Sequence, residues 1–230
     1  MINISLNDIV QKTTVEKTDT KLFWRYFVKH ANEVIIKPEE DYCKVTGCAF
    51  EINEENRKIV RTLIDYFCGL EEFNKSEVVR NNASLQKGLL IFGDCGVGKT
   101  VLFEIIRRVG RDIYSAIGVK RMLFKKISCG SFVSAYMIAT KSKNMSFDLK
   151  EFQKGRLFID DLGFEKLAFN QYELMEQILF ERYSNNAVTF LTTNLTPSEI
   201  ENRYGKRIGD RLQEMFNYIK WEGNSFRDNL

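Results

Sequence analysis

The spacing of hydrophobic positions along this 230-residue chain changes near residue 88. Before that point, apolar side chains recur every three or four residues, which predicts helices over residues 21–34 and 54–68. After it, short continuous apolar runs alternate with segments of helical spacing. The runs predict strands over residues 88–92, 122–127, 156–159, 187–191 and, as a fifth, 218–221. The segments between and after them predict helices over residues 100–109, 131–140, 171–185 and 197–216.

Apolar runs of strand length separated by helices are typical of a parallel sheet that is covered on both faces. We therefore expect an α/β fold with a five-stranded parallel sheet between helices. Residues 81–230 would form this main domain. Residues 1–80 would form a small, mostly helical N-terminal extension that is a candidate for binding a partner.

The composition favours a cytoplasmic protein. No apolar stretch approaches the ~20 residues that a membrane span needs, and the first residues lack the order of a signal peptide. The five cysteines are odd in number and scattered, so they do not suggest a disulfide framework. The Cys43–Cys48 spacing is a weak zinc signal, and His30, the single histidine, is expected to be a surface or packing residue.

The net charge of +3 is too small to indicate a nucleic-acid-binding protein, but basic residues exceed acidic ones in residues 81–230. A patch of basic side chains attracts the phosphates of nucleic acids, and the alternative is a solvated face of a helix and a strand. The local concentration consists of Arg107, Arg108, Arg111, Lys120, Arg121, Lys125 and Lys126.

The strongest motif is Gly-x4-Gly-Lys-Thr at residues 93–100, directly after a predicted strand and before a predicted helix. Its glycines let backbone N–H groups turn toward phosphates, and the helix N-terminus adds a positive dipole end. Lys99 is expected to reach the β- and γ-phosphates of ATP, and Thr100 to ligate Mg²⁺. The nucleotide-binding residues are then Gly93, Asp94, Cys95, Gly96, Val97, Gly98, Lys99, Thr100 and Val101.

Two further strands end in polar residues, where ligands bind in parallel α/β sheets. Asp160 and Asp161 end the strand over 156–159, and we expect Asp160 to hold Mg²⁺ and Asp161 to orient the attacking water. Because Asp161 is one methylene shorter than the usual glutamate, Glu165 is an alternative for that role. Asn194 follows the strand over 187–191 and is expected to hydrogen-bond the γ-phosphate or the water, as a sensor 1 residue does.

Several arginines come late in the chain. Arg203, Arg207 and Arg211 recur at helical spacing, and Arg227 closes the segment Glu222-Gly-Asn-Ser-Phe-Arg. Such an arginine at a subunit edge can reach the γ-phosphate of a neighbour. The alternative is a basic helix face that pairs with nearby acidic residues, namely Asp210 and Glu214.

Taken together, these motifs resemble the AAA+ ATPases of the DnaC/IstB type. The resemblance extends over about residues 80–230 and includes Thr192-Thr-Asn-Leu195, Arg207-Ile-Gly-Asp-Arg211-Leu and Gly223-Asn-Ser-Phe-Arg227. It implies a P-loop NTPase of the AAA+ (additional-strand) class that binds and hydrolyses ATP with Mg²⁺. It also implies that Arg211 is an arginine finger acting in trans and that Arg227 is the sensor 2 arginine.

The same resemblance implies an ATP-dependent homo-oligomer that binds single-stranded or duplex DNA and acts on a replicative helicase or a transposase. A DnaC-like helicase loader in DNA replication is the leading interpretation. The alternatives are an IstB-like transposition helper ATPase and, because of Asp161, an ATP-gated protein-binding switch with little hydrolysis. A small-molecule kinase has no supporting acceptor-binding motif.

The role of the aromatic residues in the first predicted helix stays open. One hypothesis is that Phe23, Trp24 and Phe27 form a docking face for the helicase or transposase. The alternative is that they pack on the ATPase core.

Overall fold

A computed structural model describes residues 15–36, 50–142 and 147–226. Two helices precede the sheet, α1 (Thr20–Ile36) and α2 (Arg57–Cys68), followed by the short 3-10 helix η2 (Glu71–Lys75). Strands and helices then alternate as predicted. They are β1 (Gly88–Gly93), α3 (Lys99–Ile117), β2 (Lys125–Ser128), α4 (Cys129–Ser142), the 3-10 helix η3 (Leu149–Phe152), β3 (Leu157–Leu162), α5 (Leu174–Ser184), β4 (Thr189–Thr193), α6 (Pro197–Tyr204), α7 (Lys206–Met215) and β5 (Phe216–Trp221).

The five strands form one parallel sheet in the order β2-β3-β4-β1-β5. In register, Leu90 of the internal strand β1 pairs with Leu191 of β4 and with Tyr218 of β5. Because the strands are parallel, their carboxyl ends meet at one edge of the sheet. This order brings the ends of β3, β4 and β1 side by side, and the prediction of a five-stranded parallel sheet is confirmed.

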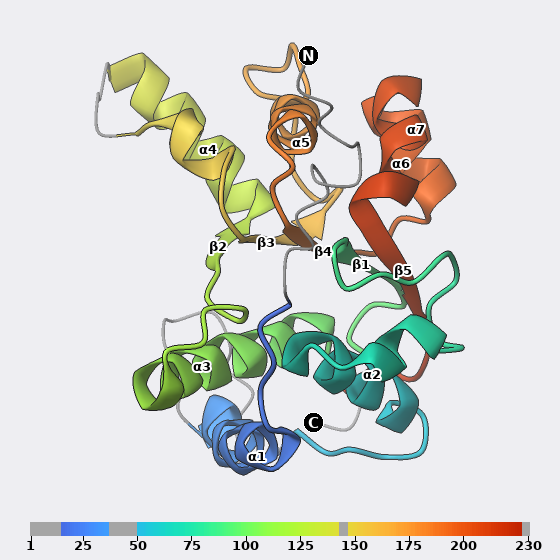
Figure 1. The fold of residues 1–230 in the computed structure, drawn as a ribbon. Helices are drawn as coiled ribbons and strands as arrows, with labels where there is room; N and C mark the ends of the chain where they lie inside the picture. Colours follow the sequence, from blue (N-terminus) through green and yellow to red (C-terminus); the bar gives the residue numbers. More distant parts are fainter. Residues whose placement is uncertain (1–14, 37–49, 143–146, 227–230) are drawn as a thin grey trace, which may run out of the picture.

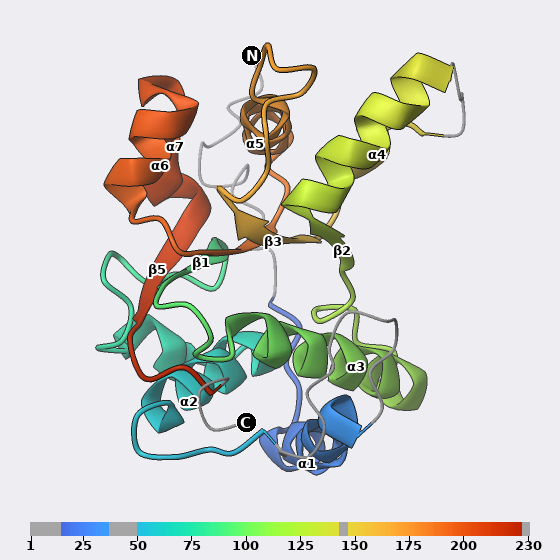
Figure 2. The same cartoon turned by 180° about the vertical axis from the view of Figure 1, so that it is seen from behind.

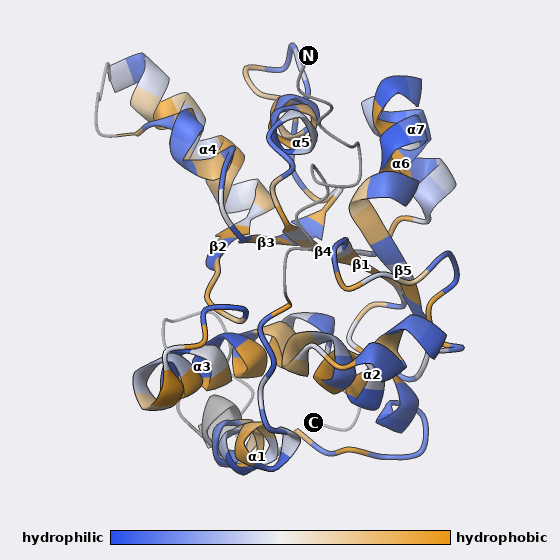
Figure 3. Cartoon of the chain, viewed as in Figure 1, coloured by the Kyte–Doolittle hydropathy of each residue, from blue (hydrophilic) through white to orange (hydrophobic). Residues whose placement is uncertain are grey.

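Helices cover both faces of the sheet (Figures 1 and 2). Alternate residues of β1 point to opposite faces, as the pleat requires. Leu89 and Ile91 belong to the core under α1, α2 and α3, whereas Leu90 and Phe92 belong to the core under α4–α7. Strand β1 is apolar, and the outer sides of α2, α6 and α7 are largely hydrophilic (Figure 3). No helix of the described residues is long and apolar enough to cross a membrane.

Helix α3 is longer, and strand β2 starts later, than the sequence predicts. Helix α3 continues through Gly110, where a close approach requires glycine: a Cβ there would lie 2.4 Å from the carbonyl oxygen of Met122. The helix ends instead at Gly118, whose φ of 75° suits glycine. Met122 lies beside Gly110 of α3, and strand β2 begins only after it, at Lys125.

Helix α1 packs on α3 and shares the core that covers that face of the sheet. The side chains of Phe23 and Phe27 are 0% and 1% exposed, so the hypothesis that these two residues form a docking face is wrong. They pack on the core, as the alternative stated, and only Trp24 of the three is exposed. His30 is a packing residue whose ring nitrogen lies 2.9 Å from Asp112 of α3.

The packing of α1 predicts unequal effects for neighbouring substitutions. Phe27→Ala should lower the free energy of unfolding by about 3–5 kcal/mol, because it leaves a cavity in a closed core. Val28→Ala, at the exposed next position, should change it by about 0.5 kcal/mol or less. Chemical denaturation measures both, and equal effects would contradict the packing of α1 on the core.

Candidate nucleotide-binding site

The loop that joins β1 to α3 has the backbone conformation of a phosphate cradle. Gly96 and Gly98 adopt φ angles of 80° and 99°, which glycine adopts at little cost. Gly98 caps the N-terminus of α3, so the first N–H groups of the helix face the loop. Cys95 is exposed, and Val97 and Val101 anchor the loop on the core.

Lys99 connects this loop to the end of strand β4. Its Nζ donates to the carbonyl oxygens of Gly93 and Asp94, at 2.9 and 2.6 Å, and to Oδ1 of Asn194 at 2.8 Å. Burial lowers the pKa of Lys99, an effect that the charge of Asp161 opposes most. The structure therefore brings Lys99 and Asn194 together, although 95 positions separate them in the chain.

Asp160 lies at the centre of a second group of contacts. Its Oδ1 accepts hydrogen bonds from the hydroxyls of Thr100, at 2.8 Å, and Thr192, at 2.6 Å. Its Oδ2 lies 3.3 Å from Nζ of Lys126. The oxygens of Thr100 and Asp160 are the kind of ligand that Mg²⁺ prefers, and Mg²⁺ takes few protein ligands beside phosphates and water. These two residues therefore fit the metal.

Asp161 differs from Asp160 in its exposure to water. A β-bulge between β3 and β4 lies at this point, and Asp161 has a φ of 55° that leaves its side chain exposed between two buried neighbours. Its N–H donates to the hydroxyl of Thr192 at 3.2 Å. Aspartate tolerates the left-handed conformation better than most residues. The carboxylate is thus held at the surface beside the buried Asp160.

The carboxylate of Glu165 is buried and engaged by other groups, which disfavours the alternative in which it replaces Asp161. Its buried carboxylate accepts a hydrogen bond from the N–H of Gly163 at 2.9 Å and another from the hydroxyl of Tyr204. It also pairs with Arg203 at 3.3 Å. Burial, and next the charge of Glu165, raise the pKa of Tyr204. Glu165 therefore holds the loop after β3 against α6.

The late arginines have different environments. Arg203 is a structural residue that donates to the carbonyls of Gly163 and Glu165 and pairs with Glu173. Arg207 stacks on Phe180 of α5, with 3.7 Å between the guanidinium carbon and the ring centre. Arg211 donates to the carbonyl of Arg207 at 2.6 Å and lies 5.0 Å from the ring centre of Tyr183. These contacts lie within one chain, and the role of Arg211 in trans stays a prediction.

Arg227 lies outside the described residues, as do Cys43 and Cys48. The described segment before Arg227 crosses the phosphate loop. Gly223 donates its N–H to Asp94 at 3.1 Å, and Phe226 donates its N–H to the carbonyl of Gly96, also at 3.1 Å.

The local concentration of basic residues is not one exposed patch. Arg108 and Arg121 are buried, and Arg121 donates to two backbone carbonyls. Three others pair with carboxylates: Arg107 with Glu104, Lys125 with Glu151, and Lys126 with Asp160. Burial therefore removes Arg108 and Arg121 from any nucleic-acid surface, and such a surface on the remaining members stays a prediction.

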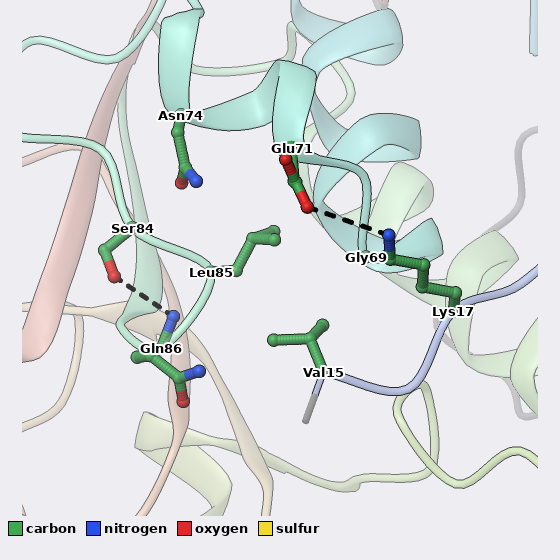
Figure 4. Close-up of a pocket in the computed structure, with 8 residues that line it drawn as sticks. All are labelled: Val15, Lys17, Gly69, Glu71, Asn74, Ser84, Leu85 and Gln86. Atoms are coloured by element: carbon green, nitrogen blue, oxygen red, sulfur yellow. Dashed lines mark hydrogen bonds and ion pairs between the residues drawn. The ribbon is translucent and has the colours of Figure 1, made fainter. Parts of the chain in front are cut away.

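A groove of about 390 Å³ lies on another part of the molecule (Figure 4). Ser84, Leu85 and Gln86 of this groove come shortly before β1, at the end of that strand opposite the phosphate loop. An ion pair of 3.8 Å between Lys17 and Glu71 lies on the rim of the groove. It is lined by Val15, Lys17, Gly69, Glu71, Asn74, Ser84, Leu85 and Gln86. These residues include neither a glycine-rich turn nor the N-terminus of an α-helix, so the candidate nucleotide site is the loop before α3.

Sequence reasoning missed Thr192 and Lys126 as neighbours of Asp160. A threonine in an otherwise apolar buried strand is a weak signal that could have indicated Thr192. Nothing local marks Lys126, because its contact depends on the pairing of β2 with β3.

The contacts of the two acidic residues predict different effects on stability. Glu165→Gln should lower the free energy of unfolding by about 1–3 kcal/mol, because it disturbs buried hydrogen bonds and an ion pair. Asp161→Asn, at an exposed position that suits asparagine, should change it by about 0.5 kcal/mol or less. Urea denaturation followed by circular dichroism measures both changes. The assignment of Glu165 as a structural residue fails if its variant is as stable as the unmodified protein.

Comparisons with known proteins agree with this fold. No protein-family model matches the chain, and no curated protein matches it either. Among solved structures, the DnaC helicase loader superimposes with a TM-score of 0.52 at 23% identity, covering 74% of this chain and 92% of that one. AMPPCP-bound DnaA from Aquifex aeolicus superimposes with a TM-score of 0.51 at 18% identity, covering 78% of this chain and 50% of that one. The chain therefore shares its fold with the DnaC helicase loader and with the part of DnaA that it superimposes on.

Proposed function

We propose that this chain binds and hydrolyses ATP with Mg²⁺ in DNA replication, as a DnaC-like helicase loader. The observation that carries the ATPase proposal is the convergence of three strand ends. The phosphate loop after β1, Asp160 on β3 and Asn194 after β4 are joined by the contacts of Lys99 and Thr100. A glycine turn that binds no ligand would not require the ends of these three strands to contact one another.

Each of these residues has a role that follows from its chemistry. Lys99 supplies a positive charge to the β- and γ-phosphates, and the N–H groups at the start of α3 donate to phosphate oxygens. Asn194 accepts from Lys99 with Oδ1, which leaves its amide NH₂ as a donor for a γ-phosphate oxygen or the attacking water. Thr100 and Asp160 would hold Mg²⁺, which neutralises charge on the phosphates when it is bound.

Asp161 is the residue that we assign to positioning the attacking water. It is exposed next to Asp160, and its charge acts on Lys99. Its carboxylate is one methylene shorter than that of glutamate, and Glu165 is engaged with α6. These two observations favour the second candidate function, an ATP-gated protein-binding switch with little hydrolysis. A kcat that rises in Asp161→Glu would support the switch, because a longer carboxylate would then reach the water better.

The proposal of a helicase loader is supported by the fold shared with the DnaC helicase loader. By this analogy, the partners are a replicative helicase and single-stranded DNA, and the chain acts as an ATP-dependent homo-oligomer. A pull-down from the native host in the presence of ATP distinguishes the helicase from the transposase of the IstB-like alternative, since it identifies the partner directly.

Lys99→Ala should abolish ATP binding, because it removes the one side-chain cation that contacts the phosphate loop and Asn194 among the described residues. Titration with a fluorescent ATP analogue measures the affinity, and we expect a loss of at least about 100-fold. Lys87→Ala is a matched control, because the ammonium group of this lysine donates to the carbonyl of Asn82, away from the phosphate loop. Tight binding by Lys99→Ala would overturn the assignment of the site.

Arg211→Ala should leave ATP binding intact and lower kcat by about 10³-fold or more, if the arginine acts across a subunit boundary as fingers do. Mixing it with Lys99→Ala should restore part of the activity, because the second variant supplies Arg211 to the intact site of the first. Steady-state hydrolysis of the two variants and of their mixture measures this recovery. Normal turnover by Arg211→Ala alone would exclude a role in trans.

A further inference from the structure

The carboxylate of Asp160 has a counter-ion from within the chain. Lys126 lies on the edge strand β2 and pairs in register with Phe158, two positions before Asp160 on β3. Its Nζ lies 5.7 Å from the ring centre of Phe158 and 3.3 Å from Oδ2 of Asp160. The lysine side chain therefore extends along β3 toward the site, and its ammonium group ends beside the aspartate.

Both oxygens of Asp160 are occupied by groups of the chain. Oδ1 accepts from the hydroxyls of Thr100 and Thr192, and Oδ2 faces Lys126. The side chain of Asp160 is 6% exposed, whereas that of Lys126 is 30% exposed. A carboxylate so deeply buried requires hydrogen bonds or an opposite charge, and here it has both.

A second carboxylate lies within reach of the charge of Lys126. Glu104 is one turn after Thr100 on α3 and pairs with Arg107 at 2.7 Å and with Arg108 at 3.5 Å. Burial raises the pKa of Glu104, but the hydrogen bond from Arg107 and the charges of Arg107, Lys126 and Arg108 together lower it. The half-exposed Lys126 therefore has an acidic neighbour besides Asp160 when its ammonium group moves.

We propose that Lys126 is a built-in competitor of Mg²⁺ at Asp160. Two cations beside the same carboxylate repel each other, and this repulsion is stronger in a partly buried site than in water. A divalent ion can then occupy the site only when the ammonium group withdraws, so Lys126 raises the concentration of free Mg²⁺ that the protein needs. This inference rests on the proposed function, because it concerns the magnesium site assigned there.

Binding of Mn²⁺ to the nucleotide-free protein tests the proposal without any hydrolysis. Loss of the electron paramagnetic resonance signal of free Mn²⁺ reports the bound fraction at low ionic strength. Lys126→Met keeps the length of the side chain and removes its charge, and we expect it to bind Mn²⁺ roughly tenfold more tightly than the unmodified protein. Lys126→Arg keeps the charge and should bind as the unmodified protein does.

Lys125→Met is the matched control, because it removes the same charge from the neighbouring position of the same strand. Lys125 pairs with Glu151 at 3.0 Å, away from Asp160, so its loss should leave the affinity for Mn²⁺ unchanged. In the presence of ATP, Lys126→Met should also lower the Mg²⁺ concentration at half-maximal nucleotide binding by a similar factor. Circular dichroism verifies folding, and Lys126→Gln replaces Lys126→Met if the latter does not fold.

Equal affinities of Lys126→Met, Lys125→Met and the unmodified protein for Mn²⁺ would overturn the proposal, and so would a weaker affinity in Lys126→Met alone. Failure of the proposed function has a different result, since all variants, and the unmodified protein, would then bind no ATP. Normal ATP binding together with equal affinities for Mn²⁺ would thus reject only the role of Lys126.

Discussion

The burial of Asp160 is the constraint on which the arrangement of this site depends. A carboxylate that is almost inaccessible to water must be surrounded by donors, and its donors come from three other elements of the fold. Thr100 belongs to α3, Thr192 to β4 and Lys126 to β2, so one side chain of β3 connects the helix and both neighbouring strands. The same contacts that satisfy a buried charge therefore fix the distance between the phosphate loop and the end of the sheet.

Much of the fold could be predicted from the sequence because its signals are local. Buried parallel strands give continuous apolar runs, and the phosphate loop has a fixed spacing of glycine, lysine and threonine. Boundaries were less accurate where a distant contact decides them. Helix α3 continues through Gly110, which the backbone of Met122 approaches closely, and the helix expected over 197–216 is divided at Gly205, whose φ is 88°.

The candidate site was predictable where each residue stands at a strand end, as Asp160 and Asn194 do. It was not predictable where chemistry depends on which strands are neighbours. The order of the sheet places β2 beside β3, and this alone brings Lys126 to Asp160. Likewise, Glu165 and Tyr204 are 39 positions apart, and only the packing of α6 shows that the glutamate is buried beside the tyrosine.

The position of α1 has a consequence for how the chain can respond to a partner. Helix α1 lies along α3, whose first residue is Lys99, and the two share Phe23, Phe27 and Phe103 in one core. A chain that lacks residues 1–80 would expose this apolar side of α3 to water, so it would be prone to aggregate. Any protein that moves α1 also changes the support of the helix that begins at the phosphate loop. Helix α1 therefore contacts the same helix that carries Lys99 of the candidate nucleotide site.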